Sequence, residues 1–130
     1  MNIDFNTSTP IYLQIILEFK RQIAVGVLKP GEKVPSQRDL AALLKVNANT
    51  VQRAYREMET LGMVETLRGQ GTFVCQDEKI VEETRTEMLK DLVDDFVHAM
   101  RSLGLTQEET VKEVEQMFQK LELKGEVSDE

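Results

Sequence analysis

The stretch from Pro35 to Val74 constrains the fold of this chain most, because it carries four structural signals in a set order. Two short helical patterns come first, and two strand-like segments closed by a glycine-rich tip follow. Ser36 and Asp39 have the spacing of a capping box, in which each side chain bonds the backbone of the other. Asn47 is a residue type that favours the start of a second helix. The stretch therefore predicts two helices joined by a tight turn, followed by a β-hairpin.

The second predicted helix has one apolar and one polar face. Its apolar residues recur every three or four positions, as on one side of an α-helix, and they are Val51, Ala54, Tyr55, Met58 and Leu61. At about 100° per residue, the polar side chains on the opposite face are Asn49, Gln52, Arg53 and Arg56. Amides and guanidiniums in such a row suit a recognition helix in a DNA major groove. For the helical pair alone, a merely solvated polar face is the commoner arrangement.

The hairpin favours the DNA-binding interpretation. Met63–Leu67 and Gly71–Cys75 read as paired strands, and residues 68–71 form the tip. Helix, turn, helix and hairpin, in this order, form a winged helix. We therefore expect a mainly α fold with a small β-hairpin, built as a winged helix-turn-helix domain with a helical tail.

Several motifs in this stretch resemble the signature of the GntR family of bacterial transcription regulators. They run from Ser36 to Ala41, from Val46 to Val51 and from Gly69 to Val74, in matching order and spacing. The run from Asn47 to Arg56 and the short tail are most similar to the YtrA-like subfamily. The resemblance implies a DNA-binding transcription regulator that represses by occupying an operator, and it suggests transporter genes as targets.

The residue types and the resemblance together predict the side chains that contact DNA. A guanidinium in the first turn of the first helix can bind phosphate or reach a guanine edge. Asn and Gln pair with adenine and Arg with guanine, while glycines at the wing tip let the backbone approach DNA. The predicted DNA-binding residues are Ser36, Arg38, Asn47, Asn49, Thr50, Gln52, Arg53, Arg56, Arg68, Gly69, Gln70 and Gly71.

Some of these residues have a plain structural alternative. Asn47 suits a purely capping role, and Arg38 suits a surface ion pair. Many family members carry arginines near the positions of Ala48 and Gln52, and both are absent here. The base preference of the family is therefore not carried over to this chain.

The net charge of −7 is unusual for a DNA-binding protein. The charge is unevenly distributed: residues 1–75 hold nine basic and seven acidic side chains, whereas residues 76–130 hold seven and sixteen. The first segment is therefore +2 and the second −9. Because screening limits phosphate attraction to about 8–10 Å at physiological salt, a cationic face on the first segment can still bind DNA.

The remaining residues offer little for catalysis, and we expect no enzyme, no metal site and no cofactor. His98 is the one histidine and lacks a second metal ligand nearby in sequence, while Cys75 is the one cysteine and cannot form an internal disulfide. No apolar run approaches the ~20 residues of a membrane span, and the N-terminus lacks the pattern of a leader peptide. We expect a cytoplasmic protein without a membrane partner.

The N-terminal region predicts a helix that opens at Thr9 and Pro10, with Thr9 as the cap and Pro10 in the first turn. Its apolar stripe of Tyr12, Ile15, Ile16, Phe19 and Ile23 is widened by Leu13 and Leu17. The side chains expected on the wet side are Gln14, Glu18 and Arg21.

Two further helical patterns, over residues 80–103 and 107–121, predict a dimerisation tail. Gly104 marks the end of the first, and Thr106 with Glu109 forms a capping box at the start of the second. We expect two domains, 1–75 for DNA binding and 76–130 for dimerisation, and an operator that is an inverted repeat. The alternative is that both helices fold back onto the first domain. The predicted interface residues are Leu89, Leu92, Val93, Phe96, Met100, Val114 and Phe118.

Two alternatives to a DNA-binding homodimer require other sequence features. A protein-interaction adaptor that uses a winged helix without DNA would present apolar residues on the exposed face of the second helix. An effector-gated sensor would need a ligand pocket, and two tail helices do not easily enclose a metabolite. A small-molecule effector is therefore doubtful and its identity unknown, as are the operator sequence and the regulated genes.

Overall fold

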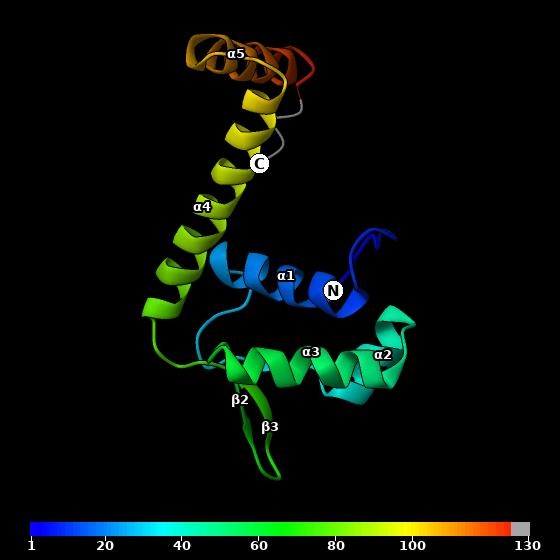
Figure 1. The fold of residues 1–130 in the computed structure, drawn as a ribbon. Helices are drawn as coiled ribbons and strands as arrows, with labels where there is room; N and C mark the ends of the chain where they lie inside the picture. The colour runs from blue at the N-terminus through cyan, green and yellow to red at the C-terminus, as the bar shows by residue number, and fades with distance from the viewer. Residues whose placement is uncertain (126–130) are drawn as a thin grey trace. The chain divides into compact units, whose positions relative to one another are not determined.

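The computed structural model describes residues 1–125, and residues 126–130 at the end of the predicted tail lie outside the described part. The fold is mainly helical with a small antiparallel sheet, as the sequence predicts (Figure 1). The elements are α1 (Ile11–Ala24), β1 (Lys33–Val34), α2 (Gln37–Leu44), α3 (Ala48–Thr60), β2 (Val64–Leu67), β3 (Gly71–Val74), α4 (Lys79–Ser102) and α5 (Gln107–Leu123).

The chain forms two compact units that divide inside α4, between Met88 and Leu89. The first turns of α4 belong to the N-terminal unit because Ile80 and Val81 pack against its core and Thr84 is buried. Lys20 on α1 also forms an ion pair with Glu87, with 3.3 Å between Nζ and Oε1. The predicted boundary after Cys75 divides a DNA-binding domain from a dimerisation domain, whereas the boundary in α4 divides packing units. The functional boundary stays a prediction.

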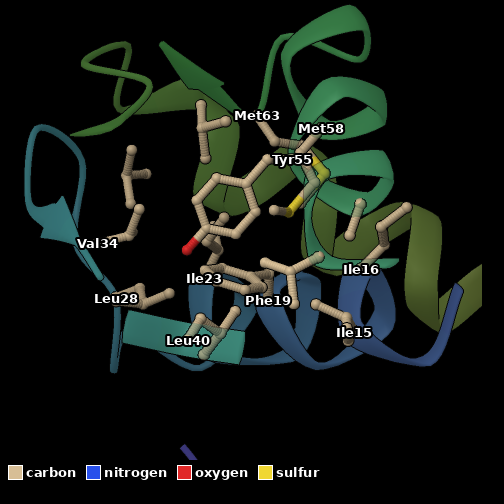
Figure 2. Close-up of a cluster of buried hydrophobic side chains, with 14 of the residues drawn as sticks. Ile15, Ile16, Phe19, Ile23, Leu28, Val34, Leu40, Tyr55, Met58 and Met63 are labelled. Carbon is tan, nitrogen blue, oxygen red and sulfur yellow. The ribbon is translucent and has the colours of Figure 1, made fainter. Parts of the chain in front are cut away.

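The core of the N-terminal unit lies where α1 and α2 pack against α3 (Figure 2). Phe19 and Tyr55 meet edge to face in it, with ring centroids 5.9 Å apart. Val34 and Val74 extend the core from the helices to the sheet. Burial of these side chains removes apolar surface from water, which is the main force that holds the helices together.

The sheet has the strand order β1–β3–β2, with both pairs antiparallel. Val64 pairs with Val74 and Leu67 with Gly71, so the two strands predicted from the sequence pair as a hairpin. Lys33 pairs with Phe73, so Lys33 and Val34 form a third strand in addition to the predicted hairpin. This strand anchors one side of the wing to the chain that enters α2.

The N-terminal helix differs from its prediction in three respects. Pro10 is the N-cap rather than a residue of the first turn, and no side chain caps this end. Gln14 is buried rather than wet, because its amide bonds the backbone of Asn6 and Thr9 and so fastens the preceding segment to α1. Leu13 and Leu17 do not widen the buried stripe; both are exposed.

The C-terminal unit contains the rest of α4 and α5. The left-handed Gly104, with φ of 86°, ends α4 as predicted, and Leu105 donates its N–H to the carbonyl of Met100. The predicted capping box of Thr106 and Glu109 is complete in both directions. No residue of α5 is fully buried. The exposed apolar side chains of the unit include Leu92, Phe96, Val111 and Phe118.

Candidate nucleic-acid interface

The helix-turn-helix begins with α2, whose first turn carries Ser36 and Arg38. Ser36 Oγ accepts the N–H of Asp39 at 3.1 Å, but no carboxylate bond returns to Ser36, so only half of the predicted capping box forms. Arg38 is exposed in this turn. Lys45 ends α2 in the left-handed conformation with φ of 57° and donates its N–H to Ala41. The reversal at Lys45 allows the tight turn into α3.

The N-terminus of α3 is capped by Asn47, as predicted. Its Oδ1 accepts the N–H of Asn49 at 2.7 Å, which leaves the amide NH₂ of Asn47 unused by the cap. Asn47 and Asn49 are exposed and Thr50 is half-buried. Because a helix N-terminus carries partial positive charge, these residues lie where an anionic oxygen is favoured.

The two faces of α3 are those predicted from the spacing, apart from Leu61. Val51, Ala54, Tyr55 and Met58 are buried. Leu61, predicted on the apolar face, is the C-cap and is half exposed. The four polar side chains predicted for the opposite face, Asn49, Gln52, Arg53 and Arg56, are all exposed, and so are Glu57, Glu59 and Thr60 toward the end of the helix.

Arg53 has a neighbour that sequence spacing could not reveal. Its guanidinium carbon lies 3.9 Å from the centroid of the Tyr12 ring, and Nη2 donates to the Tyr12 hydroxyl at 3.2 Å. Tyr12 belongs to α1 and lies 41 residues earlier in the chain. A residue assigned to the apolar stripe of α1 is therefore half-buried and also touches the polar face of α3.

The tip of the wing is a tight turn in which Gln70 donates its N–H to Leu67 at 2.9 Å. Gly69 occupies the third position with φ of +79°, a conformation that type II turns require and that favours glycine. Nothing lies within 4 Å of where its side chain would be. Arg68 and Gln70 are exposed beside it, so the tip is open to a partner.

Gly71 makes room for Lys33, which is not among the predicted DNA-binding residues. A Cβ at Gly71 would lie 2.7 Å from Cε of Lys33, whose side chain extends across the start of β3. The pairing of β1 with β3 brings this lysine to the wing. Its only sequence signal was a basic residue in an extended segment, which is too common to be specific.

The cations of this face are not neutralised by neighbours. Among residues 1–125, no carboxylate pairs with Arg38, Arg53, Arg56 or Arg68. Arg21 on α1 differs, since its guanidinium bonds Glu18 and holds the pKa of that carboxyl below its usual value. Four guanidiniums without a carboxylate partner, from α2, α3 and the wing, therefore lie exposed together with the amides of α3.

The described residues also bear on other chemistries. Within residues 1–125, no group of three His, Cys, Asp or Glu side chains is placed to hold a metal ion. His98 Nδ1 lies 2.8 Å from the carbonyl oxygen of Asp94, one turn earlier on α4. None of the helices in this range combines the length and hydropathy needed to cross a bilayer.

Comparison with known proteins identifies relatives of this chain. The family model described as bacterial regulatory proteins, gntR family, matches residues 11–74. The chain is 46% identical over 112 residues to the uncharacterized HTH-type transcriptional regulator YhcF of Bacillus subtilis, covering 86% of this chain and 93% of YhcF. It is 45% identical over 104 residues to the HTH-type transcriptional repressor YtrA of the same organism, covering 76% and 80%.

Solved structures agree with these sequence matches. A GntR family transcriptional regulator from Listeria monocytogenes superposes with a TM-score of 0.82 at 35% identity, covering 86% of this chain and 98% of that one. AraR(DBD) in complex with operator ORX1 superposes with a TM-score of 0.53 at 25% identity, covering 58% and 96%. These matches confirm the family resemblance that the sequence motifs indicate.

Proposed function

The chain belongs to the GntR family of bacterial regulatory proteins, and from this premise we propose that it is a sequence-specific DNA-binding repressor. The observation that carries the proposal is the row of unpaired guanidiniums and exposed amides on α2, α3 and the wing. A face of this composition matches the phosphates and base edges of a duplex. It does not match an adaptor surface, which would be apolar at the same positions.

We assign the contacts by element. The N-terminus of α3 and the side chains of Gln52 and Arg56 enter the major groove, where amides and guanidiniums distinguish base pairs. Arg38 binds a backbone phosphate, and Arg68 at the wing tip binds phosphate or the minor groove. The glycines of the tip let the backbone approach the duplex closely. The remaining proposed contacts are Ser36, Asn47, Asn49, Thr50, Arg53, Gly69, Gln70 and Gly71.

We also propose that the protein binds as a homodimer through α4 and α5. Most of the stability of a helix in a protein comes from packing of its apolar face, and no residue of α5 is fully buried in one chain. A two-fold contact covers the same apolar patch twice and closes. It also arranges two α3 helices for an inverted repeat. The proposed interface residues are Leu89, Leu92, Val93, Phe96, Met100, Val114 and Phe118.

The physiological setting follows from the function proposed. A repressor acts where the chromosome lies, so we place the protein in the cytoplasm. Control of transporter genes is the expectation from the resemblance to the YtrA-like subfamily, and it rests on that resemblance alone.

Selection of bound duplexes from random DNA at low salt tests the function. One inverted-repeat sequence should be enriched, and its affinity should fall about 10³–10⁵-fold between about 50 and 200 mM salt if a dimer makes about 6–10 phosphate contacts. Arg38→Ala should weaken all duplexes alike and lower the salt slope by about one unit. Lys112→Ala, which removes a charge on α5, is the matched control and should bind as the wild type does. Enrichment of no sequence would contradict the proposal.

A further inference from the structure

Tyr12 and Arg53 form a contact between α1 and α3 that the assigned roles leave unexplained. The guanidinium lies over the ring at 3.9 Å, and one of its N–H groups bonds the phenol oxygen at 3.2 Å. Tyr12 is itself packed against the hydrophobic core, so its ring is a fixed platform. Stacking and a hydrogen bond together hold a long flexible side chain in one place, although Arg53 is exposed to solvent.

The pair retains hydrogen-bond donors that it does not use internally. A guanidinium has five N–H donors, and the bond to Tyr12 uses one of them. Because the phenol oxygen accepts that bond, its own proton is free to donate to another acceptor. No carboxylate pairs with Arg53 among residues 1–125. Such a group of donors, carrying one positive charge, suits an anion with several acceptor oxygens.

The position of Arg53 on α3 indicates which anion this is. With Gln52 taken as zero and about 100° per residue, Arg56 lies near about 40°, Asn49 near about 60° and Arg53 near about 100°. Arg53 is therefore the last of these four side chains on one side, with only the exposed Glu57 beyond it near about 140°, and its contact with Tyr12 shows that this side is the one next to α1. A recognition helix reads bases along its centre, while the backbone strands of the groove pass along its flanks.

We infer that Tyr12 and Arg53 together bind a DNA backbone phosphate beside the recognition helix, with Tyr12 positioning the guanidinium and donating its hydroxyl. The inference rests on the proposed DNA-binding function, but it changes the role of Arg53 from reading a guanine to binding phosphate. It also adds α1 to the interface. Base reading by α3 then depends on Asn49, Gln52 and Arg56.

Two substitutions separate the parts of this pair. Tyr12→Phe keeps the ring under the guanidinium and removes only the hydroxyl, and Arg53→Ala removes the charge. Affinity is measured for the selected operator, for its single-base variants and for an unrelated duplex, each at several salt concentrations. Arg56→Ala is the matched control, because Arg56 is exposed on the same helix and pairs with no carboxylate in the described chain.

Arg53→Ala should weaken the operator and the unrelated duplex alike, by about tenfold, and lower the salt slope by about one unit. Its base-preference profile should match that of the wild type, whereas Arg56→Ala should relax the preference at one base pair. Tyr12→Phe should weaken both duplexes about fivefold with an unchanged salt slope, because no charge is lost. In the Arg53→Ala background Tyr12→Phe should weaken both duplexes by less than fivefold, because the positioning of the guanidinium no longer matters and only the hydroxyl contact is lost. Tyr12→Phe should melt at the wild-type temperature.

Wild-type binding by Tyr12→Phe, or loss of preference at one base pair in Arg53→Ala, would overturn the inference. A wild-type protein that enriches no sequence, yet binds an unrelated duplex in a Tyr12-dependent way, would support the phosphate contact and contradict the regulator. A wild-type protein that binds no duplex at low salt would contradict both.

Discussion

Tyr55 connects α3 to α1 and to the start of α2. It is fully buried against Phe19, and its hydroxyl donates to the carbonyl oxygen of Pro35, just before α2. Burial raises the pKa of the Tyr55 phenol above its ordinary value, and the carboxylate of Asp39 adds to the rise. The folded protein therefore favours the neutral phenol. This contribution to stability is complete below the unfolded pKa of about 10 and is lost as pH rises further toward the folded pKa.

Tyr55→Phe should lower the free energy of unfolding by about 1 kcal/mol near neutral pH, because the Pro35 carbonyl loses its partner. The difference between the two proteins should shrink above about pH 10, since only the wild type can release a proton from Tyr55 on unfolding. Urea unfolding of both proteins across this range measures the difference. A difference that stays constant into the alkaline range would show that the phenol is not protected by burial.

The close approach of Lys33 to Gly71 leads to a second prediction. Gly71 has φ of +123°, and a methyl group there would meet Cε of Lys33. Gly71→Ala should cost about 1–3 kcal/mol, part from backbone strain and part from displacing the lysine. In the background of Lys33→Ala the cost should be smaller, because only strain remains. Gly69→Ala is the control: its backbone is strained but its surroundings are open, so its cost should not depend on Lys33. Equal costs of Gly71→Ala in both backgrounds would show that Lys33 does not crowd Gly71.

At the scale of the element, the N-terminus of α3 combines a structural and a proposed recognition role in Asn47. Asn47→Asp keeps the oxygen that accepts the N–H of Asn49, and it places a negative charge at the positive end of the helix. Its stability should therefore equal or exceed that of the wild type, while affinity for the operator falls at least about tenfold through repulsion of phosphate. Asn47→Ala should lose about 1 kcal/mol of stability as well as affinity.

Thermal unfolding and duplex binding of these two variants separate the roles. A stable Asn47→Asp protein that binds DNA as tightly as the wild type would mean that Asn47 is only a cap. Thr106→Ala removes the same kind of cap from α5, which is not among the proposed DNA contacts, so it is the control for a loss of capping alone. It should lower stability without changing the base preference.

At the scale of the whole molecule, the acidic tail and its exposed apolar stripe determine the assembly that we propose. Phe96→Asp or Leu92→Asp would place an unpaired carboxylate in the proposed interface, where burial of a charge is costly. Each variant should run as a monomer in light scattering and bind a half-site weakly. Gln119→Asp, at an exposed position on α5 outside the stripe, should remain dimeric. A wild-type protein that stays monomeric at tens of micromolar and binds its operator as one copy contradicts the dimer.

Features that depend on residues close together in the chain could be predicted from the sequence. The caps at Asn47 and at Thr106 with Glu109, the turn glycine of the wing and the end of α4 at Gly104 all follow from residues within a few positions of one another. Helix capping, turn conformation and the apolar spacing of α3 depend on short-range geometry, so a single sequence suffices to predict them. The same signals carry the family resemblance.

Contacts between residues far apart in the chain are seen only in the folded protein. Gln14 is buried because the chain before α1 folds back onto it, and Leu13 and Leu17 are exposed because α1 packs through a narrower face. The contact of Tyr12 with Arg53 joins residues 41 positions apart, and strand pairing brings Lys33 to Gly71. Such contacts depend on how whole elements pack, and neither periodicity nor residue type encodes the partner of a side chain across that distance.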